Sequence, residues 1–378
     1  MKVFKRSANK KSDRPACERL PVISIVLLAL TGVCALLTLV FRLSPAFSDF
    51  FNRYISQGLR RLLAAVTSPL PFSLAEILLM LSPALLVFLV VYALRTHASS
   101  WRACGMYVLK LLSGACVFFI LFVTVFGAGY YGTTLADPEK LDLDRQDVSA
   151  EELYETGLHL IEDLRREEQN VQFEHEDFSV MPYTLKEMNQ KLLSAYESFC
   201  GEHDFIATFQ SRTKPVILSR AMSYTHITGV YSYFTGEANL NVYFPDYTLP
   251  FTAAHELAHQ RGIAREDEAN FIAYLVCISS DDAYIRYSGY LNLYEYVASA
   301  LYRADADLYF ELRDQLPTAV RYELIAYSEF FDEFRDSVVG EISNTVNDLY
   351  LKGNGTQGSQ SYGLVVDLAV AYDKKTNP

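Results

Sequence analysis

Two histidines and a glutamate are spaced for metal chemistry in the second half of the chain. His255, Glu256 and His259 form the pattern His-Glu-x-x-His. On a helix, residues four apart project from one face with about 5–6 Å between their Cβ atoms, which suits two imidazole ligands of one zinc ion. Glu256 lies beside them, where its carboxylate can reach a water next to the ion without binding the metal. The pattern predicts a zinc site that activates water.

The third ligand separates one class of zinc protease from another. In an HExxHxxGxxH pattern, a histidine follows the glycine and completes the site. This chain has Gly262 at the glycine position but Arg265 at the histidine position, and an arginine cannot bind a metal. That subtype is therefore excluded. Gly262 is instead placed to end the helix that carries the histidines, and Thr252 is a residue type that caps its start.

Two acidic residues that follow the glycine remain as third ligands. If Glu266 binds the metal, Asn270 lies four residues further on the same helix face, where it can hydrogen-bond the free ring nitrogen of a ligating histidine. If Glu268 binds, the equivalent residue is Ile272, which has no polar group. We therefore prefer Glu266. Glu268 and Asp267 are interpreted as acidic residues at the start of a helix, where the helix dipole favours them.

The motif resembles that of the gluzincin zinc metallopeptidases, in which a glutamate from a following helix completes the site. Here the ExxAN sequence that begins at Glu266 and ends at Asn270 matches their ExxA[DN]-type motif. This match covers about 20 residues of the chain. The chain also resembles, over most of its length, an uncharacterised family of bacterial membrane proteins that have three N-terminal spans and a HELAHQRG-type motif, found here at 255–262.

The gluzincin resemblance implies both a fold and a chemistry. It implies a mainly α, α+β zincin-like domain in which His255, His259 and Glu266 bind Zn2+. Glu256 would be the general base, which takes a proton from water and passes it to the departing amine. The chain departs from the pattern in two ways. Only six residues separate His259 from Glu266, fewer than in most of that group, and Asn270 replaces the usual aspartate.

A hydrolase of this type also needs a donor for the developing oxyanion. Tyr287, Tyr290 and Tyr362 are candidates, although the chain has 26 tyrosines and a packing role is the alternative for each. The histidines outside the motif, including His226, lack such a partner pattern. We expect them to be ordinary surface or core residues.

Local patterns indicate the elements around the motif. Ser149 opens an amphipathic helix, and 185–199 is a second helical stretch. Segments 216–218, 230–234 and 237–244 are rich in β-branched and aromatic residues, which predicts a small antiparallel sheet. The last of these strands precedes the motif. Its residues 238–241 could form an exposed edge that pairs with an extended peptide, or the strand could be internal.

The composition divides the chain at Leu135. Residues 1–135 carry 14 Lys and Arg against four Asp and Glu, whereas the remainder carries 19 against 41, so a net charge of +10 is followed by one of −22. The acidic half argues against nucleic acid as a partner. We predict a membrane domain over 1–135 and an extracytoplasmic, metallopeptidase-like domain over 136–378.

Three uncharged runs in the first half are long enough to cross a hydrocarbon layer about 30 Å thick as helices. They are residues 22–41, 77–94 and 111–135. Basic residues precede the first run, and Arg95, Arg102 and Lys110 lie between the second and third. Because cytoplasmic segments are enriched in Lys and Arg, we expect both segments in the cytoplasm and the C-terminal domain outside the cell membrane.

The loop between the first two spans, 42–76, combines aromatic residues and leucines with Arg53, Arg60 and Arg61. This combination fits either an amphipathic stretch on the bilayer surface or a short packing helix between the spans.

Together these patterns predict a multi-pass membrane protein that hydrolyses peptide bonds with a zinc-activated water, so a peptide or protein is the expected substrate. The alternative is a non-catalytic membrane protein whose outer domain binds metal structurally or recognises a ligand. Glu256 discriminates between the two, because a structural metal site has no use for a carboxylate beside an open coordination position.

Overall fold

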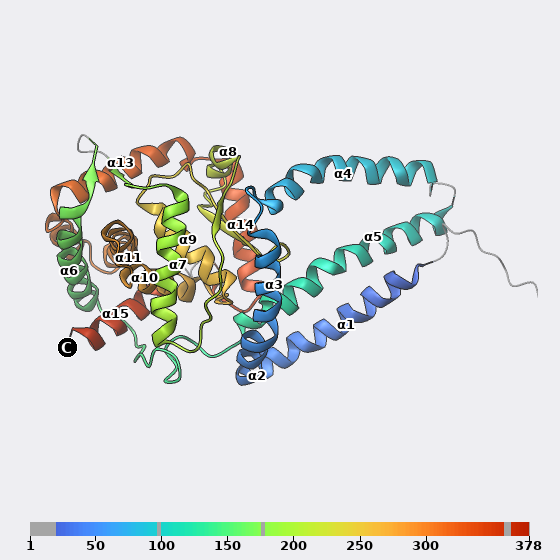
Figure 1. Ribbon diagram of the computed structural model, residues 1–378, viewed down its shortest axis with the longest axis horizontal. Helices are drawn as coiled ribbons and strands as arrows, with labels where there is room; N and C mark the ends of the chain where they lie inside the picture. The colour runs from blue at the N-terminus through green and yellow to red at the C-terminus, as the bar shows by residue number, and fades with distance from the viewer. Residues whose placement is uncertain (1–19, 97–99, 175–177, 359–363, 378) are drawn as a thin grey trace, which may run out of the picture.

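Three long apolar helices extend from one side of a helical body (Figure 1). The computed structural model describes residues 20–96, 100–174, 178–358 and 364–377. The apolar helices are α1 (Val22–Leu43), α4 (Leu74–Thr96) and the helix that begins with α5 (Trp101–Leu121). Each is long and apolar enough to cross a membrane, which confirms the three predicted apolar helices. The basic segment before the first span lies outside the described residues.

The bounds of the third span differ from the prediction. The helix continues after α5 through a π-helical turn and a 3-10 turn, η3 (Phe122–Phe126) and η4 (Gly127–Tyr130). It therefore ends before Leu135. It also begins earlier than the uncharged run, because Ser100 accepts a hydrogen bond from the Ala103 N–H at 3.1 Å and caps the first turn. An uncharged run marks the apolar centre of a span, whereas capping sets its ends.

The loop between the first two spans is helical and runs crosswise to them (Figure 1). It consists of α2 (Pro45–Phe50), a π-helical turn η2 (Phe51–Ser56) and α3 (Gln57–Thr67). One face of this segment is buried, including Arg60 and Ala64. The opposite face carries Tyr54, Leu62 and Val66, which are 62–66% exposed. The segment thus packs between the spans and the body, and it also presents an apolar face to its surroundings.

Arg60 is the buried polar centre of this segment. Its guanidinium donates to the Val125 carbonyl at 2.7 Å, to the Asn52 side-chain oxygen at 2.8 Å and to the Arg261 carbonyl at 3.4 Å. Burial lowers the pKa of Arg60 to about 10, which still leaves it charged at neutral pH. One side chain therefore connects the crosswise segment, the end of the third span and the body.

Capping residues start the first two helices of the body. Ser149 with Glu152, and Thr184 with Glu187, form capping boxes, which confirms the helix predicted after Ser149. The body contains α6 (Ala150–Glu167), η5 (Glu168–Asn170), α7 (Leu185–Glu202), α8 (Ser219–Ser223), α9 (Thr248–Gln260), α10 (Glu266–Ile278), α11 (Ala283–Ala304), α12 (Ala306–Asp314), α13 (Thr318–Arg335), α14 (Val338–Gly353) and α15 (Val365–Thr376).

Two small sheets accompany these helices. β1 (Gln172–Phe173) and β2 (Ser179–Val180) pair antiparallel. The second sheet contains β3 (Thr213–Pro215), β4 (Gly229–Ser232) and β5 (Glu237–Leu240) in the order β3-β5-β4. The predicted antiparallel pairing holds for β4 and β5, but β3 pairs with β5 in parallel, so the sheet is mixed.

The position of β5 decides between the two roles considered for it. It lies between β3 and β4 and is hydrogen-bonded on both sides, so it is an internal strand and cannot offer an edge to a peptide. The edge beside the motif helix belongs to β4 instead. β5 follows β4 directly in sequence, but it is not the outer strand of the sheet. β3, from an earlier part of the chain, pairs with the other side of β5.

The two helices that carry the motif form the centre of the body (Figure 1). Every residue of α9 except His255 is buried, and α10 is buried from Glu266 to Cys277. Because few polar groups are tolerated at such depth without partners, the polar residues of these two helices need a local explanation.

The second span is joined to the sheet by buried charges. Glu237 of β5 accepts hydrogen bonds from the Leu74 and Ala75 N–H groups at 3.0 and 2.9 Å and so caps α4. The Lys214 ammonium of β3 lies 2.6 Å from the same carboxylate. Glu76 accepts from the Ile217 N–H at 2.9 Å. Hydrogen bonds therefore connect the two predicted domains, 1–135 and 136–378, directly.

We predict that Arg60→Ala lowers the free energy of unfolding by about 3 kcal/mol, because it leaves several buried carbonyl groups unpaired. Thermal unfolding of the full chain in detergent measures this. Arg53→Ala, on the exposed face of the same segment, is the matched control and should change stability by less than about 1 kcal/mol. Equal effects of the two substitutions would show that Arg60 does not hold the segment to the body.

Candidate metal centre

A tight turn after α9 brings Glu266, the acidic residue predicted as third ligand, back to the two histidines. Gly262 has a φ of +101°, a left-handed conformation that favours glycine. The Gly262 N–H donates to the His259 carbonyl at 2.9 Å, and the Ile263 N–H donates to the Ala258 carbonyl at 3.1 Å. This pair of hydrogen bonds is a Schellman motif, which ends α9 as predicted. The chain reverses there, and α10 begins at Glu266.

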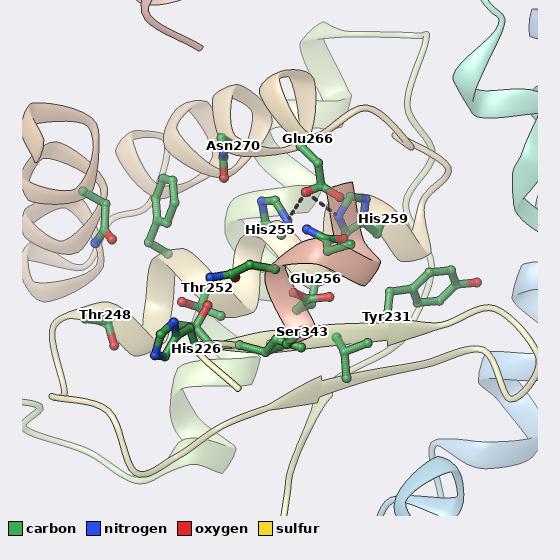
Figure 2. Close-up of a pocket in the computed structure, with 18 of the residues that line it drawn as sticks. His226, Tyr231, Thr248, Thr252, His255, Glu256, His259, Glu266, Asn270 and Ser343 are labelled. Carbon is green, nitrogen blue, oxygen red and sulfur yellow. Dashed lines mark ion pairs between the residues drawn. The ribbon is translucent and has the colours of Figure 1, made fainter. Parts of the chain in front are cut away.

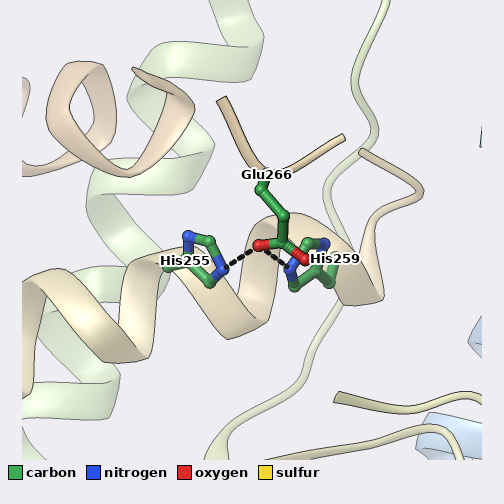
Figure 3. A group of neighbouring side chains, drawn as sticks. All are labelled: His255, His259 and Glu266. Carbon is green, nitrogen blue, oxygen red and sulfur yellow. Dashed lines mark ion pairs between the residues drawn. The ribbon is translucent and has the colours of Figure 1, made fainter. Parts of the chain in front are cut away.

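The turn places three metal-ligand groups around one point (Figure 3). The Glu266 Oε2 atom lies 3.2 Å from His255 Nε2 and 3.4 Å from His259 Nε2. One ligand atom from each of the three residues lies within 4.8 Å of the others. Two imidazoles and one carboxylate are a donor set of catalytic zinc sites, in which the fourth position is left to water or substrate. The three residues fit such an ion by chemistry and by spacing.

The hydrogen bonds of the two imidazoles differ. His259 Nδ1 lies 2.7 Å from the Ile263 carbonyl, which can only accept, so Nδ1 carries the proton and Nε2 is left for a metal. His255 Nδ1 is buried without a partner, and so is the Asn270 side-chain nitrogen. Asn270 lines the cavity beside the cluster, but the hydrogen bond expected from it to a ligating histidine is not formed among the described residues. A backbone carbonyl takes that role for His259.

The cluster is strongly coupled electrostatically. Burial disfavours the ionised Glu266, yet the adjacent His259 and His255 outweigh burial and hold the pKa of this carboxyl well below its usual range. Burial lowers the pKa of His259, but Glu266 and Glu256 reverse this effect and raise it to about 9. The Glu266 carboxylate thus favours positive charge on the His259 imidazole. A divalent cation can replace the proton that supplies this charge.

Glu256 lies beside the cluster without joining it. Its side chain is buried, and its Oε2 atom has no hydrogen-bond partner. Burial raises the pKa of Glu256, while the two imidazoles act in the opposite direction. Gly229 of β4 lies against this side chain, and a Cβ atom at that position would be 2.6 Å from both Cγ and Oε1 of Glu256. The glycine therefore lets the edge strand approach the predicted base.

The other acidic residues of α10 point elsewhere. Glu268 accepts from the Leu135 N–H at 3.0 Å and from the Arg265 guanidinium at 2.9 Å. Asp267 lies 3.4 Å from the Arg145 guanidinium, and burial raises its pKa to about 6. Of the two glutamates considered as third ligand, only Glu266 faces the imidazoles. Glu268 instead fixes the segment that leaves the third span.

A cavity of about 1010 Å³ opens over the cluster. Figure 2 shows His255, Glu256 and Glu266 directed towards it. Its walls come from the edge strand β4 and from α9, α10, α11, α13 and α14. Some lining residues had no local signal in the sequence, because they belong to helices and a turn that reach the site only through packing. They include His226, Glu295, Tyr296, Tyr327 and Tyr350.

The tyrosines proposed as oxyanion donors do not line this cavity. The Tyr287 hydroxyl is buried and donates to the Glu323 carboxylate. Tyr290 packs against Tyr274 with ring centroids 6.0 Å apart. The structure therefore does not bring Tyr287 or Tyr290 to the cavity, and both make the contacts expected of the packing alternative. Tyr362 lies outside the described residues.

His226 was expected to be an ordinary residue, but it lies at the cavity wall. Its Nε2 atom is 2.7 Å from the Phe334 carbonyl, which therefore accepts the ring proton. Its φ of +61° and the close approach of Gly340 to its ring fix its position. His226, in the turn between α8 and β4, thus contacts the end of α13 through this hydrogen bond and α14 through Gly340.

Comparison with known proteins adds a family but no activity. The fold and cluster define a mainly helical membrane protein with a buried His-His-Glu group. The chain belongs to the family described as a protein of unknown function (DUF3810), whose model matches residues 48–370. No curated protein and no solved structure matches the chain.

We predict a pH dependence of stability from Glu295 in the cavity wall. Burial, followed by the nearby Glu323, raises the pKa of Glu295 to about 8, compared with about 4.3 in an unfolded chain. The folded state therefore binds a proton more tightly. The resulting stability is fully present below about pH 4 and is lost as the pH rises to about 8.

The midpoint of thermal unfolding should consequently fall between about pH 5 and pH 9, and it should fall less in Glu295→Gln. Glu329→Gln, at an exposed position on α13, should keep the slope of the wild type. If Glu295→Gln and Glu329→Gln show the same slope, Glu295 does not titrate as predicted.

Proposed function

We propose that this protein is a membrane-anchored zinc metallopeptidase. The observation that carries the proposal is the convergence of His255, His259 and Glu266 beside a buried Glu256 carboxylate, whose Oε2 atom has no hydrogen-bond partner, at a cavity wall. Structural zinc sites fill all four positions with protein ligands, whereas this cluster supplies three. The body would lie outside the cytoplasm, in accordance with the basic residues before the first span and between the second and third.

The residues divide the chemistry of peptide hydrolysis between them. Zinc, when bound, would polarise the substrate carbonyl and acidify water at its open position. His259 is held in the required tautomer by the Ile263 carbonyl, so its Nε2 lone pair points to the cluster. Burial of Glu256 raises its pKa, which suits a group that takes a proton from water and passes it to the departing amine.

The edge strand β4 supplies a surface for an extended substrate. Gly229, Val230 and Tyr231 line the cavity, and Val230 is 45% exposed. β4 pairs with β5 on one side only among the described strands. A peptide that added to its other side would place its backbone next to Glu256, because Gly229 contacts that side chain. This moves the peptide-binding role expected for 238–241 to the neighbouring strand.

The non-catalytic alternative makes a different use of the same cluster. In that reading the metal, or the Glu266–imidazole ion pairs alone, would stabilise the turn between α9 and α10. Glu256 would then have no function, and its buried, unpaired oxygen would only destabilise the folded state. The water-activating role explains this group, and for that reason we favour the peptidase.

The metal content of the purified full chain tests the ligand set. We expect about one zinc ion per chain for the wild type and a marked loss in His259→Ala and in Glu266→Gln. Glu268→Gln is the matched control, since this residue faces Arg265 and Leu135, and it should retain the metal. Inductively coupled plasma mass spectrometry gives the count. A wild type that folds without zinc in zinc-supplemented medium would refute the metal centre.

A second substitution tests catalysis separately from metal binding. Glu256→Gln should keep the zinc and lower the hydrolysis of a fluorogenic peptide library by about 10²–10⁴-fold, because the amide cannot take a proton. Zinc content and cleavage are measured on the same preparation. Loss of the metal in this variant, or unchanged hydrolysis, would overturn the role of Glu256. Zinc binding without cleavage by the wild type would support the structural-metal alternative.

A further inference from the structure

Helix α14 carries an apolar stripe that the body leaves uncovered. Val338, Ile342, Val346 and Leu349 recur at spacings of four, four and three residues, so they lie along one helix face. They are between 60% and 69% exposed. Four aliphatic side chains in one uncovered row are unusual on a surface that faces water, where such rows mark contact with a protein or a membrane.

The same helix forms part of the cavity wall. Ser343 and Asn347 line the cavity, and Figure 2 shows Ser343 at its mouth, opposite the metal cluster. Only Gly340 and Leu351 of α14 are buried, so packing against the body contributes little to its position. Ile342 and Val346 of the stripe also line the cavity, whereas Val338 and Leu349 do not, so the stripe continues from the cavity rim onto the outer surface of the helix.

The C-terminal end of α14 is attached where two spans end. The Tyr350 ring lies 6.1 Å from the Phe122 ring, and its hydroxyl is 3.2 Å from the Tyr130 hydroxyl at the end of the third span. The Arg42 guanidinium, at the end of the first span, donates to the Gly353 carbonyl at 3.3 Å. Arg42 and Tyr130 lie in the last turns of α1 and of the third apolar helix. These contacts fix one end of α14 at that level.

The direction of α14 keeps the rest of the helix at the same height along the spans as its C-terminal end. In Figure 1, α14 runs crosswise to the three spans, as α3 does. A helix that runs crosswise to the spans runs along the membrane surface and not through it. Helix α14 and the apolar face of α3, which carries Leu62 and Val66, lie at the same end of the body, next to the spans (Figure 1).

We propose that α14 is an interfacial helix, whose Val338–Leu349 stripe lies among the acyl chains of the leaflet in which the first and third spans end. The lipid bilayer is thus the partner of the stripe, and one wall of the cavity is a helix that rests on the membrane. Resting on the proposed function, this places the metal centre next to the membrane surface, where a polypeptide held at that surface can reach it.

Quenching of tryptophan fluorescence by brominated lipid tests the contact. The only tryptophan, Trp101, is 94% exposed at the start of the third span, so it is first replaced in Trp101→Phe. Val338→Trp and Leu349→Trp then mark the two ends of the stripe, and neither residue lines the cavity. Full-length variants are placed in vesicles of phosphatidylcholine with or without bromine near the top of the acyl chains. We expect at least twofold quenching at both positions.

Phe310→Trp is the matched control, because Phe310 is 45% exposed on α12, which packs on α6 far from the spans (Figure 1). It should not be quenched. Quenching at Leu349→Trp alone would mean that the helix rises away from the bilayer, and would overturn the proposal. Absence of quenching at both positions would do the same and would indicate a protein partner. Size-exclusion chromatography confirms that each variant is folded.

The fluorescence measurement does not involve metal or hydrolysis. If the lipid contact fails while zinc is bound and peptides are cleaved, only the membrane placement of α14 is refuted. If zinc is absent while both ends of the stripe are quenched, the peptidase is refuted and the interfacial helix remains.

Discussion

The reversal of the chain at Gly262 is the constraint on which the metal centre depends. Only six residues separate His259 from Glu266, so α10 must turn back directly after α9 ends. A left-handed residue with the two hydrogen bonds of a Schellman motif achieves this in the smallest number of residues. The Ile263 carbonyl exposed by the same turn accepts the ring proton of His259. The same turn thus brings the Glu266 carboxylate to the histidines and determines which ring nitrogen of His259 carries the proton.

Those parts of the site that depend on local sequence were predictable. The spacing of His255 and His259 requires only a helix. Glu266 was preferred over Glu268 because of Asn270, and Glu266 does face the imidazoles, although the Asn270 hydrogen bond is not formed among the described residues. The three apolar helices followed from uncharged runs, and the start of α6 followed from its cap. In each case one physical pattern, either a period or a cap, contains all the information needed.

Those parts that depend on packing between distant segments were not predictable. Tyr287 and Tyr290 follow the motif closely in sequence, but their helix turns them towards Glu323 and Tyr274 instead of the cavity. The edge strand beside Glu256 is β4, because β3 occupies the far side of β5. Asn270 lies on the expected face, yet the nearer Ile263 carbonyl already satisfies His259. Each outcome was set by a neighbour that the local pattern does not contain.

The turn at Gly262 is itself held from the membrane side. The Asn52 side chain donates to the Gly262 carbonyl at 3.0 Å, and Arg60 contacts both Asn52 and the Arg261 carbonyl. Gly129, near the end of the third span, approaches so closely that a Cβ atom there would lie 2.6 Å from the Gly262 oxygen. The family match begins at residue 48 and so includes all these residues. The metal cluster and the membrane-proximal helices therefore belong to one folded unit, and a fragment that begins after Leu135 would lack the groups that position Glu266.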